Sequence, residues 1–150
     1  MSKGNADGAV NRSGTKGAAA AIFWNEEGLF LGASAIVISG LSDPGTLEAL
    51  ACREALTLSH DLQIRRVSIA SDCSWLVRDI AEGNRGNYGT VINEICKRKL
   101  DLEGVEFKHE MRESNWEAHD IAKGALGLGV GWHVCLVHPP NFVNIPVILE

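Results

Sequence analysis

The chain lacks the sequence features that define several large classes of protein. In its 150 residues no apolar run approaches the ~20 residues of a membrane-spanning helix, and there is no internal repeat or low-complexity segment. Residues 1–10, MSKGNADGAV, contain no apolar h-region and do not read as a secretory signal. We therefore expect an intracellular protein, nuclear or cytoplasmic, that is not secreted and has no membrane partner.

The cysteines show neither a zinc-binding nor a redox pattern. The chain has four of them, Cys52, Cys73, Cys96 and Cys135, and they are widely and unevenly spaced. There is no Cys-x-x-Cys pair and no Cys/His cluster with zinc spacing. We expect free, mostly buried thiols in a reducing compartment.

The chain also lacks an excess of positive charge. Its net charge is −5 at pH 7, whereas proteins that bind nucleic acid through bulk charge usually carry a basic face. An enzyme that binds nucleic acid locally is still allowed, because metal ions can supply positive charge that side chains lack. One basic cluster, Lys97-Arg98-Lys99, is either a solvated helix end or a contact for a nucleic-acid backbone.

The alternation of apolar and polar residues predicts one α/β domain over residues 1–150, with a core of about 3–126 and an apolar tail at 127–150. Strands are expected in residues 1–10, 18–24, 29–39, 67–71 and 105–111. Helices are expected from 43–46 onward and over about 74–81, 90–100 and 116–126. Three strands in an antiparallel meander followed by strand–helix alternation predict a mixed sheet with helices on its faces.

Three carboxylates fall on three separate elements of this predicted fold: Asp7 on the first strand, Glu48 at the start of the first helix and Asp72 at the end of the fourth strand. If the fourth strand lies parallel beside the first, these acids become neighbours. Each pair would then repel by about 4 kcal/mol at 4 Å and an effective dielectric near 20. A bound Mg²⁺ or Mn²⁺ would relieve this repulsion, and two such ions suit phosphodiester chemistry.

Each acid also has a simpler interpretation. Asp72 precedes a helix and reads as an N-cap. Glu48 reads as a charge that complements the helix dipole, and Asp7-Gly8 reads as a turn. The order of the three acids in the predicted fold favours the metal site over these alternatives.

Four sequence segments together resemble the ribonuclease H family, and more closely the plant ribonuclease H-like domain of non-LTR retroelement reverse transcriptases. They are Asn5–Ala9 (NADGA), Leu47–Leu56 (LEALACREAL), Ala70–Cys73 (ASDC) and Arg112–Lys123 (RESNWEAHDIAK). The resemblance covers roughly residues 3–145.

The resemblance implies a mixed five-stranded sheet and two-metal cleavage of the RNA strand of RNA–DNA hybrids. Asp7, Glu48 and Asp72 match the family's first three catalytic acids and would hold Mg²⁺, or Mn²⁺ in its place. Nucleic-acid contacts are expected from Gly8 and Asn115, and the partner would be an RNA–DNA hybrid or another nucleic acid. The apolar tail is the expected surface for any protein partner.

The chain departs from the family pattern at the fourth acid. Aligned on Asn115 and Ala118, that position holds His119, and Asp120 comes one residue, or 100° of helix, later. Either residue would complete the catalytic site. The departure also allows an inactive ribonuclease H-like domain that binds nucleic acid or protein without cutting.

The first strand departs as well, since Lys3-Gly4-Asn5-Ala6 is not the apolar run of a central strand. We expect that strand to be short or poorly anchored. His109 is either an exposed strand residue or the equivalent of a loop histidine that assists product release in the family.

Overall fold

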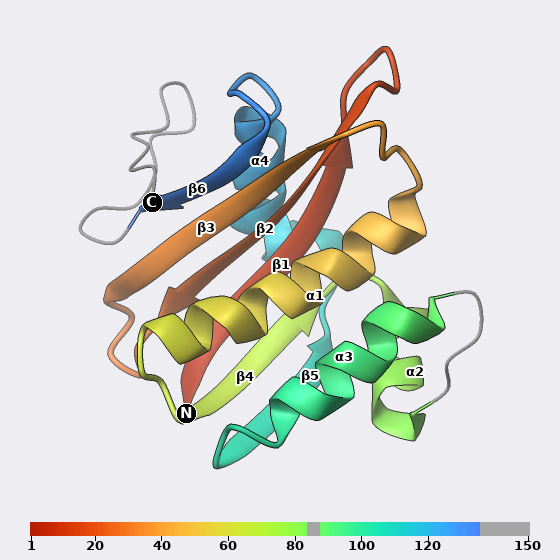
Figure 1. The fold of residues 1–150 in the computed structure, drawn as a ribbon. Coiled ribbons are helices and arrows are strands. Elements are labelled where there is room, and N and C mark those ends of the chain that lie inside the picture. Colours follow the sequence, from red (N-terminus) through yellow and green to blue (C-terminus); the bar gives the residue numbers. More distant parts are fainter. Residues whose placement is uncertain (84–87, 136–150) are drawn as a thin grey trace.

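A six-stranded mixed sheet organises the chain (Figure 1). The computed structural model of the protein describes residues 1–83 and 88–135. The strands are β1 (Ser2–Val10), β2 (Lys16–Trp24), β3 (Phe30–Ser39), β4 (Arg66–Ser71), β5 (Gly104–His109) and β6 (Gly131–Cys135). Their order across the sheet is β5-β4-β1-β2-β3-β6.

The predicted topology is confirmed in its central part. Strands β1, β2 and β3 form the antiparallel meander. Strand β4 lies parallel beside β1, and β5 lies parallel beside β4. The fold is therefore α/β and ribonuclease H-like, with a three-stranded meander extended by two parallel strands.

The prediction of a short or poorly anchored first strand is wrong. Strand β1 has nine residues and pairs on both sides, with β2 and with β4. Its residues suit a central strand because they are small or internally bonded. A Cβ at Gly4 would clash with the Phe23 ring, and the Asn5 amide donates to the side chain of Asn115. Small size and hydrogen bonding replace the apolar bulk that a central strand usually needs.

The expectation of five strands is also wrong, because part of the predicted tail forms β6. This strand pairs antiparallel with β3, from Ala33–Cys135 to Val37–Gly131. The buried Glu54 lies on the first helix, α1 (Pro44–Asp61), and accepts hydrogen bonds from the Trp132 indole on β6 at 2.5 Å and from the Ser34 hydroxyl on β3 at 2.7 Å. Residues 136–150, which complete the predicted tail, lie outside the described residues.

Helices cover both faces of the sheet, as predicted (Figure 1). They are α1 (Pro44–Asp61), α2 (Ser74–Glu82), α3 (Gly89–Lys99) and α4 (Trp116–Ala125), the last preceded by the 3-10 helix η1 (Arg112–Asn115). One core lies between the sheet and α1, α2 and α3, and a second lies between the sheet and α4. Strand β2 serves both cores, because its buried Ala18–Ala21 alternate between the two faces.

Two further predictions are tested by the described residues. Cys52, Cys73 and Cys96 are free thiols; Cys52 and Cys135 are buried, and Cys73 and Cys96 are partly buried. Over residues 1–83 and 88–135, no helix is both long enough and apolar enough to cross a membrane.

Candidate active site

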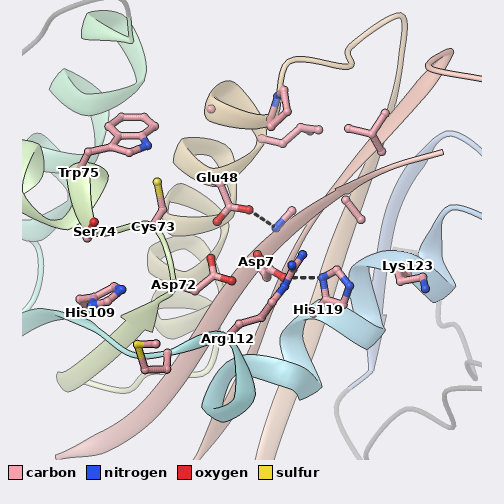
Figure 2. A pocket seen from close by; sticks show the side chains of 17 residues that line it. Asp7, Glu48, Asp72, Cys73, Ser74, Trp75, His109, Arg112, His119 and Lys123 are labelled. Atoms are coloured by element: carbon pink, nitrogen blue, oxygen red, sulfur yellow. Dashed lines mark hydrogen bonds and ion pairs between the residues drawn. The ribbon is translucent and has the colours of Figure 1, made fainter. Parts of the chain in front are cut away.

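The structure brings Asp7, Glu48 and Asp72 together where β4 ends beside β1 (Figure 2). One carboxylate oxygen from each residue lies within 4.8 Å of the others. Asp7 comes from the middle of β1, and Asp72 follows the last residue of β4. The parallel pairing of β1 with β4 places these two carboxylates side by side.

The start of α1 delivers the third carboxylate. Asp43 caps this helix by accepting the Thr46 N–H at 3.0 Å, and Pro44 opens it. Glu48 then lies one turn into the helix, over β1. Its Oε1 accepts the Gly8 N–H at 3.0 Å, so the backbone next to Asp7 orients the Glu48 carboxyl.

The simpler interpretations of the three acids do not hold. Cys73, and not Asp72, is the N-cap residue of α2, which has no side-chain cap. The first turn of α1 contains no acidic residue. Asp7-Gly8 lies inside β1 and is not a turn.

Close packing of the three acids changes their proton affinities. Burial, the contact with Asp7 and its charge raise the pKa of Glu48 to about 9. Burial and the Asp7 charge also raise the pKa of Asp72, against the smaller opposing effect of the Arg112 charge. The second oxygen of Glu48, Oε2, is buried and has no hydrogen-bond partner among the described residues. Hard oxygen ligands with one unsatisfied atom fit a divalent cation such as Mg²⁺ or Mn²⁺.

His119 occupies the position where the family pattern has a fourth acid, and it contacts the triad directly. Its Nδ1 lies 2.8 Å from Asp7 Oδ2, which fits an imidazole N–H that donates to a carboxylate. Asp120 is partly buried and is not among the residues that line the pocket. Of the two alternatives that the sequence left open, the structure places His119 at the carboxylates.

Asn115 makes buried polar contacts beside the site. Its side chain is 1% exposed, donates to the Ala6 carbonyl at 2.9 Å and accepts from the Asn5 amide at 2.7 Å. It makes no side-chain cap for α4. Because these bonds turn the amide inward onto β1, its geometry does not favour the predicted contact with nucleic acid. Asn115 instead holds the start of α4 against β1 and thereby positions His119.

A pocket of about 840 Å³ opens over the triad. It is lined by Asp7, Gly8, Ala9, Val10, Pro44, Gly45, Leu47, Glu48, Asp72, Cys73, Ser74, Trp75, His109, Met111, Arg112, His119 and Lys123. We call Asp7, Glu48 and Asp72 the acid wall, and Arg112, His119 and Lys123 the η1–α4 wall. Figure 2 shows the second set following one another along η1 and α4, beside the acids.

Sequence reasoning missed several of these lining residues. Arg112 and Lys123 bracket the Asn115–His119 motif, and the helical spacing of His119 and Lys123 was a usable signal, since residues i and i+4 share a face. His109 was left open between two interpretations; it is exposed at the end of β5 and also lines the pocket. Trp75 lines the pocket and stacks on Tyr88 with ring centroids 5.1 Å apart.

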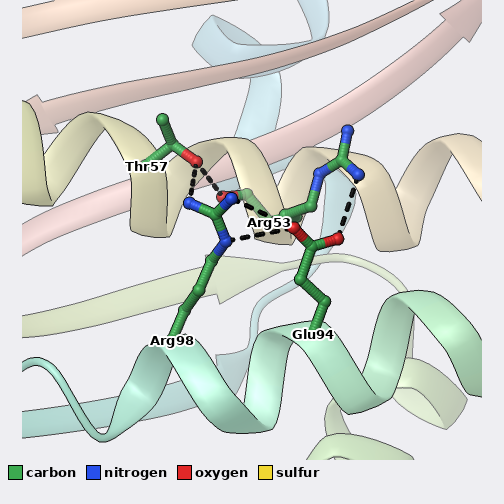
Figure 3. A network of polar contacts seen from close by, with 4 residues as sticks. All are labelled: Arg53, Thr57, Glu94 and Arg98. Carbon is green, nitrogen blue, oxygen red and sulfur yellow. Dashed lines mark hydrogen bonds and ion pairs between the residues drawn. The ribbon is translucent and has the colours of Figure 1, made fainter.

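The predicted basic contact surface lies away from this pocket. Lys97, Arg98 and Lys99 form the last turn of α3, and none of them lines the pocket. Arg98 is bonded internally, to Glu94 at 3.0 Å and to the Thr57 hydroxyl at 2.9 Å, and Arg53 shares the same glutamate (Figure 3). A nucleic-acid contact at this cluster stays a prediction, and Arg98 would have to give up these bonds to make one.

Comparison with solved structures identifies the class of fold. Ribonuclease H1 from the archaeon Halobacterium salinarum superimposes with a TM-score of 0.72 at 16% identity, covering 85% of this chain and 98% of that one. The N-terminal RNase H domain of a Mycobacterium tuberculosis protein gives 0.75 at 15% identity, covering 84% and 93%. A ribonuclease H1 called LC11, crystallised with an RNA/DNA hybrid, gives 0.70 at 19% identity, covering 82% and 94%.

The sequence also matches the family described as reverse transcriptase-like over residues 5–125. The chain belongs to this family. A search of curated proteins gives no match.

Proposed function

We propose that this domain is a ribonuclease H-type endonuclease that hydrolyses the RNA strand of RNA–DNA hybrids. The observation that carries the proposal is the convergence of Asp7, Glu48 and Asp72 within 4.8 Å in an open pocket. The structural relatives and the family match support the same class of activity. One of these relatives, LC11, was crystallised in complex with an RNA/DNA hybrid.

The acid wall would hold the metal ions that this reaction needs. Asp7, Glu48 and Asp72 offer hard oxygen ligands, and the buried Glu48 Oε2 has no other partner among the described residues. When bound, Mg²⁺ or Mn²⁺ would activate a water molecule and stabilise the leaving oxygen of the phosphodiester.

The chain's own groups prepare this site in two ways. The Gly8 N–H holds Glu48 Oε1, and the buried Oε2 has no hydrogen-bond partner among the described residues. The His119 N–H holds Asp7 Oδ2 at 2.8 Å, which fixes the rotamer of Asp7. His119 Nε2 makes no hydrogen bond with a described residue, so it is the nitrogen available to contact phosphate or move a proton.

The test is cleavage of a labelled RNA–DNA hybrid in Mg²⁺ and in Mn²⁺, with Asp7→Asn and Asp72→Asn as matched variants. We expect metal-dependent cutting of the RNA strand that both substitutions abolish. Absence of cutting in either metal, or cutting that survives both substitutions, would overturn the proposal. The plant retroelement branch that the motifs resemble is a finer proposal, which a phylogenetic placement of the sequence would test.

A second candidate function is a domain that binds nucleic acid or protein without cutting. The observation that favours it is His119 at the position of the fourth acid, because a neutral imidazole is a poorer Mg²⁺ ligand than a carboxylate. Hybrid binding in EDTA, followed by no cutting when metal is added, would favour this function over hydrolysis.

A further inference from the structure

The η1–α4 wall of the pocket carries two positive charges that the described part of the protein leaves without an ion pair. Six lysine or arginine side chains of the described residues form ion pairs with carboxylates. Arg112 and Lys123 form no such ion pair with a described residue, although both line a pocket that contains three acids. Both side chains are exposed and can reach a ligand.

The two cations have fixed positions relative to the acid wall. Figure 2 shows the Arg112 side chain extending from η1 toward Asp7 and His119, with Lys123 beyond His119 on α4. Lys123 lies one helical turn, about 6 Å, after His119. Both elements are held to β1 by the buried side chain of Asn115. The cations therefore border the acids without neutralising them through direct contact.

This arrangement suits a chain of phosphates better than a single anion. A strand that crosses the pocket beside the acid wall would present successive phosphates to the two cations. Guanidinium and ammonium groups both bind phosphate oxygens, and such contacts position a strand without reading its sequence. The alternative for Lys123 is a complement to the dipole of α4, since it lies in the last turn of that helix.

We propose that Arg112 and Lys123 form a phosphate clamp that holds the nucleic-acid strand on either side of His119, next to the acid wall. The clamp rests on the proposed function for the strand it serves, but it requires binding only and no hydrolysis. It would also explain how a chain of net charge −5 engages a polyanion, because the positive charge is placed where the strand must pass.

The test is the salt dependence of hybrid binding, measured by fluorescence anisotropy with a labelled RNA–DNA duplex in EDTA, where no cutting occurs. We expect Arg112→Gln and Lys123→Gln each to weaken binding by about fivefold at low salt. Each should also lower the slope of log K against log salt by about one. Arg66→Gln is the matched control, because Arg66 is an exposed cation at the opposite end of β4 that forms no ion pair with a described residue.

The outcomes separate the clamp from the proposed hydrolysis. A slope that falls in both variants and not in Arg66→Gln supports the clamp, whether or not the wild type cuts hybrid. An unchanged slope, or a wild type that does not bind hybrid, overturns the clamp. A role for Lys123 confined to the helix dipole would change thermal stability and leave the salt slope intact, and this result also overturns the clamp.

Discussion

The two walls of the pocket are built in different ways. The acid wall takes one carboxylate from each of three elements that are far apart in the sequence, and the order of the strands brings them together. The η1–α4 wall comes from one continuous segment, residues 112–123, fixed to β1 by a single buried asparagine. In the acid wall, burial and the contact with Asp7 raise the pKa of Glu48. The η1–α4 wall offers a hydrogen-bond donor to Asp7 and two cations that form no ion pair with a described residue.

We infer from this difference that the two walls have separate roles. The acid wall has the chemistry to hold a cation, and the η1–α4 wall has the chemistry to hold an anion. Substitutions in one wall should therefore disturb metal binding, and substitutions in the other should disturb strand binding. Four sets of variants test this separation, in order of decreasing effect.

The largest effect is expected from removing one charge of the acid wall. Asp7→Asn should weaken Mg²⁺ binding by at least about a hundredfold, because loss of a direct ligand exceeds the effect of losing an outer contact. Isothermal titration calorimetry measures the affinity, with Asp101→Asn, an exposed acid outside the pocket, as control. If Asp7→Asn binds Mg²⁺ with the wild-type affinity, the ion binds at a site that does not include Asp7.

Glu48 should make the metal-free protein less stable at high pH. Its carboxyl has a pKa of about 9 in the folded chain, against 4.5 for an ordinary exposed glutamate, so the folded state binds the extra proton between these values. The free energy of unfolding should therefore fall as pH rises from about 4.5 to about 9, by at most about 1.4 kcal/mol per pH unit.

Denaturation in EDTA across this pH range measures the effect. Glu48→Gln keeps the acceptor for the Gly8 N–H and removes the titration, so its difference from the wild type isolates the contribution of Glu48. If the two curves run parallel from about pH 4.5 to about 9, the carboxyl is already ionised and the burial argument fails.

Gly8→Ala should destabilise the fold by about 2 kcal/mol, since a Cβ there would lie 2.9 Å from Leu47 Cβ and 3.3 Å from Glu48 Oε1. The displaced α1 would also loosen Mg²⁺ binding. Urea unfolding measures the loss, and Gly129→Ala is the matched control because its Cβ would meet nothing within 4 Å. If the two variants have equal free energies of unfolding, α1 can move away from β1 without loss of stability.

The smallest effect is expected at His119, the residue of the η1–α4 wall that contacts the acid wall. His119→Asp should tighten Mg²⁺ binding and speed hybrid cleavage by about tenfold, because a carboxylate is a better ligand for a hard cation than imidazole. Asp120→Asn serves as the companion, and it should leave both quantities unchanged. A large loss in Asp120→Asn, with none in a His119 variant, would assign the fourth position to Asp120.

Much of the fold followed from local pattern. The strands expected over 18–24, 29–39 and 67–71 and the helix start expected at 43–46 each depend on a few neighbouring residues, and their positions agree with the structure. Local pattern did not predict strand β6, because this strand forms only by pairing with the edge of β3. Local pattern did not predict the length of β1 either, since the hydrogen-bond partner of its polar Asn5 is Asn115, 110 positions away in the sequence.

The sequence by itself determined which side chains carry charge and in what order the elements occur, and this was enough to name the three acids. Only the tertiary structure decided that Glu48 points at Gly8, that His119 bonds Asp7, and that Arg112 and Lys123 face the same pocket. The physical reason is the separation along the sequence between the residues that interact. Helix caps, turns and periodicity arise from neighbours along the chain, whereas the direction of a side chain in a site depends on packing between elements that meet only when the sheet has formed.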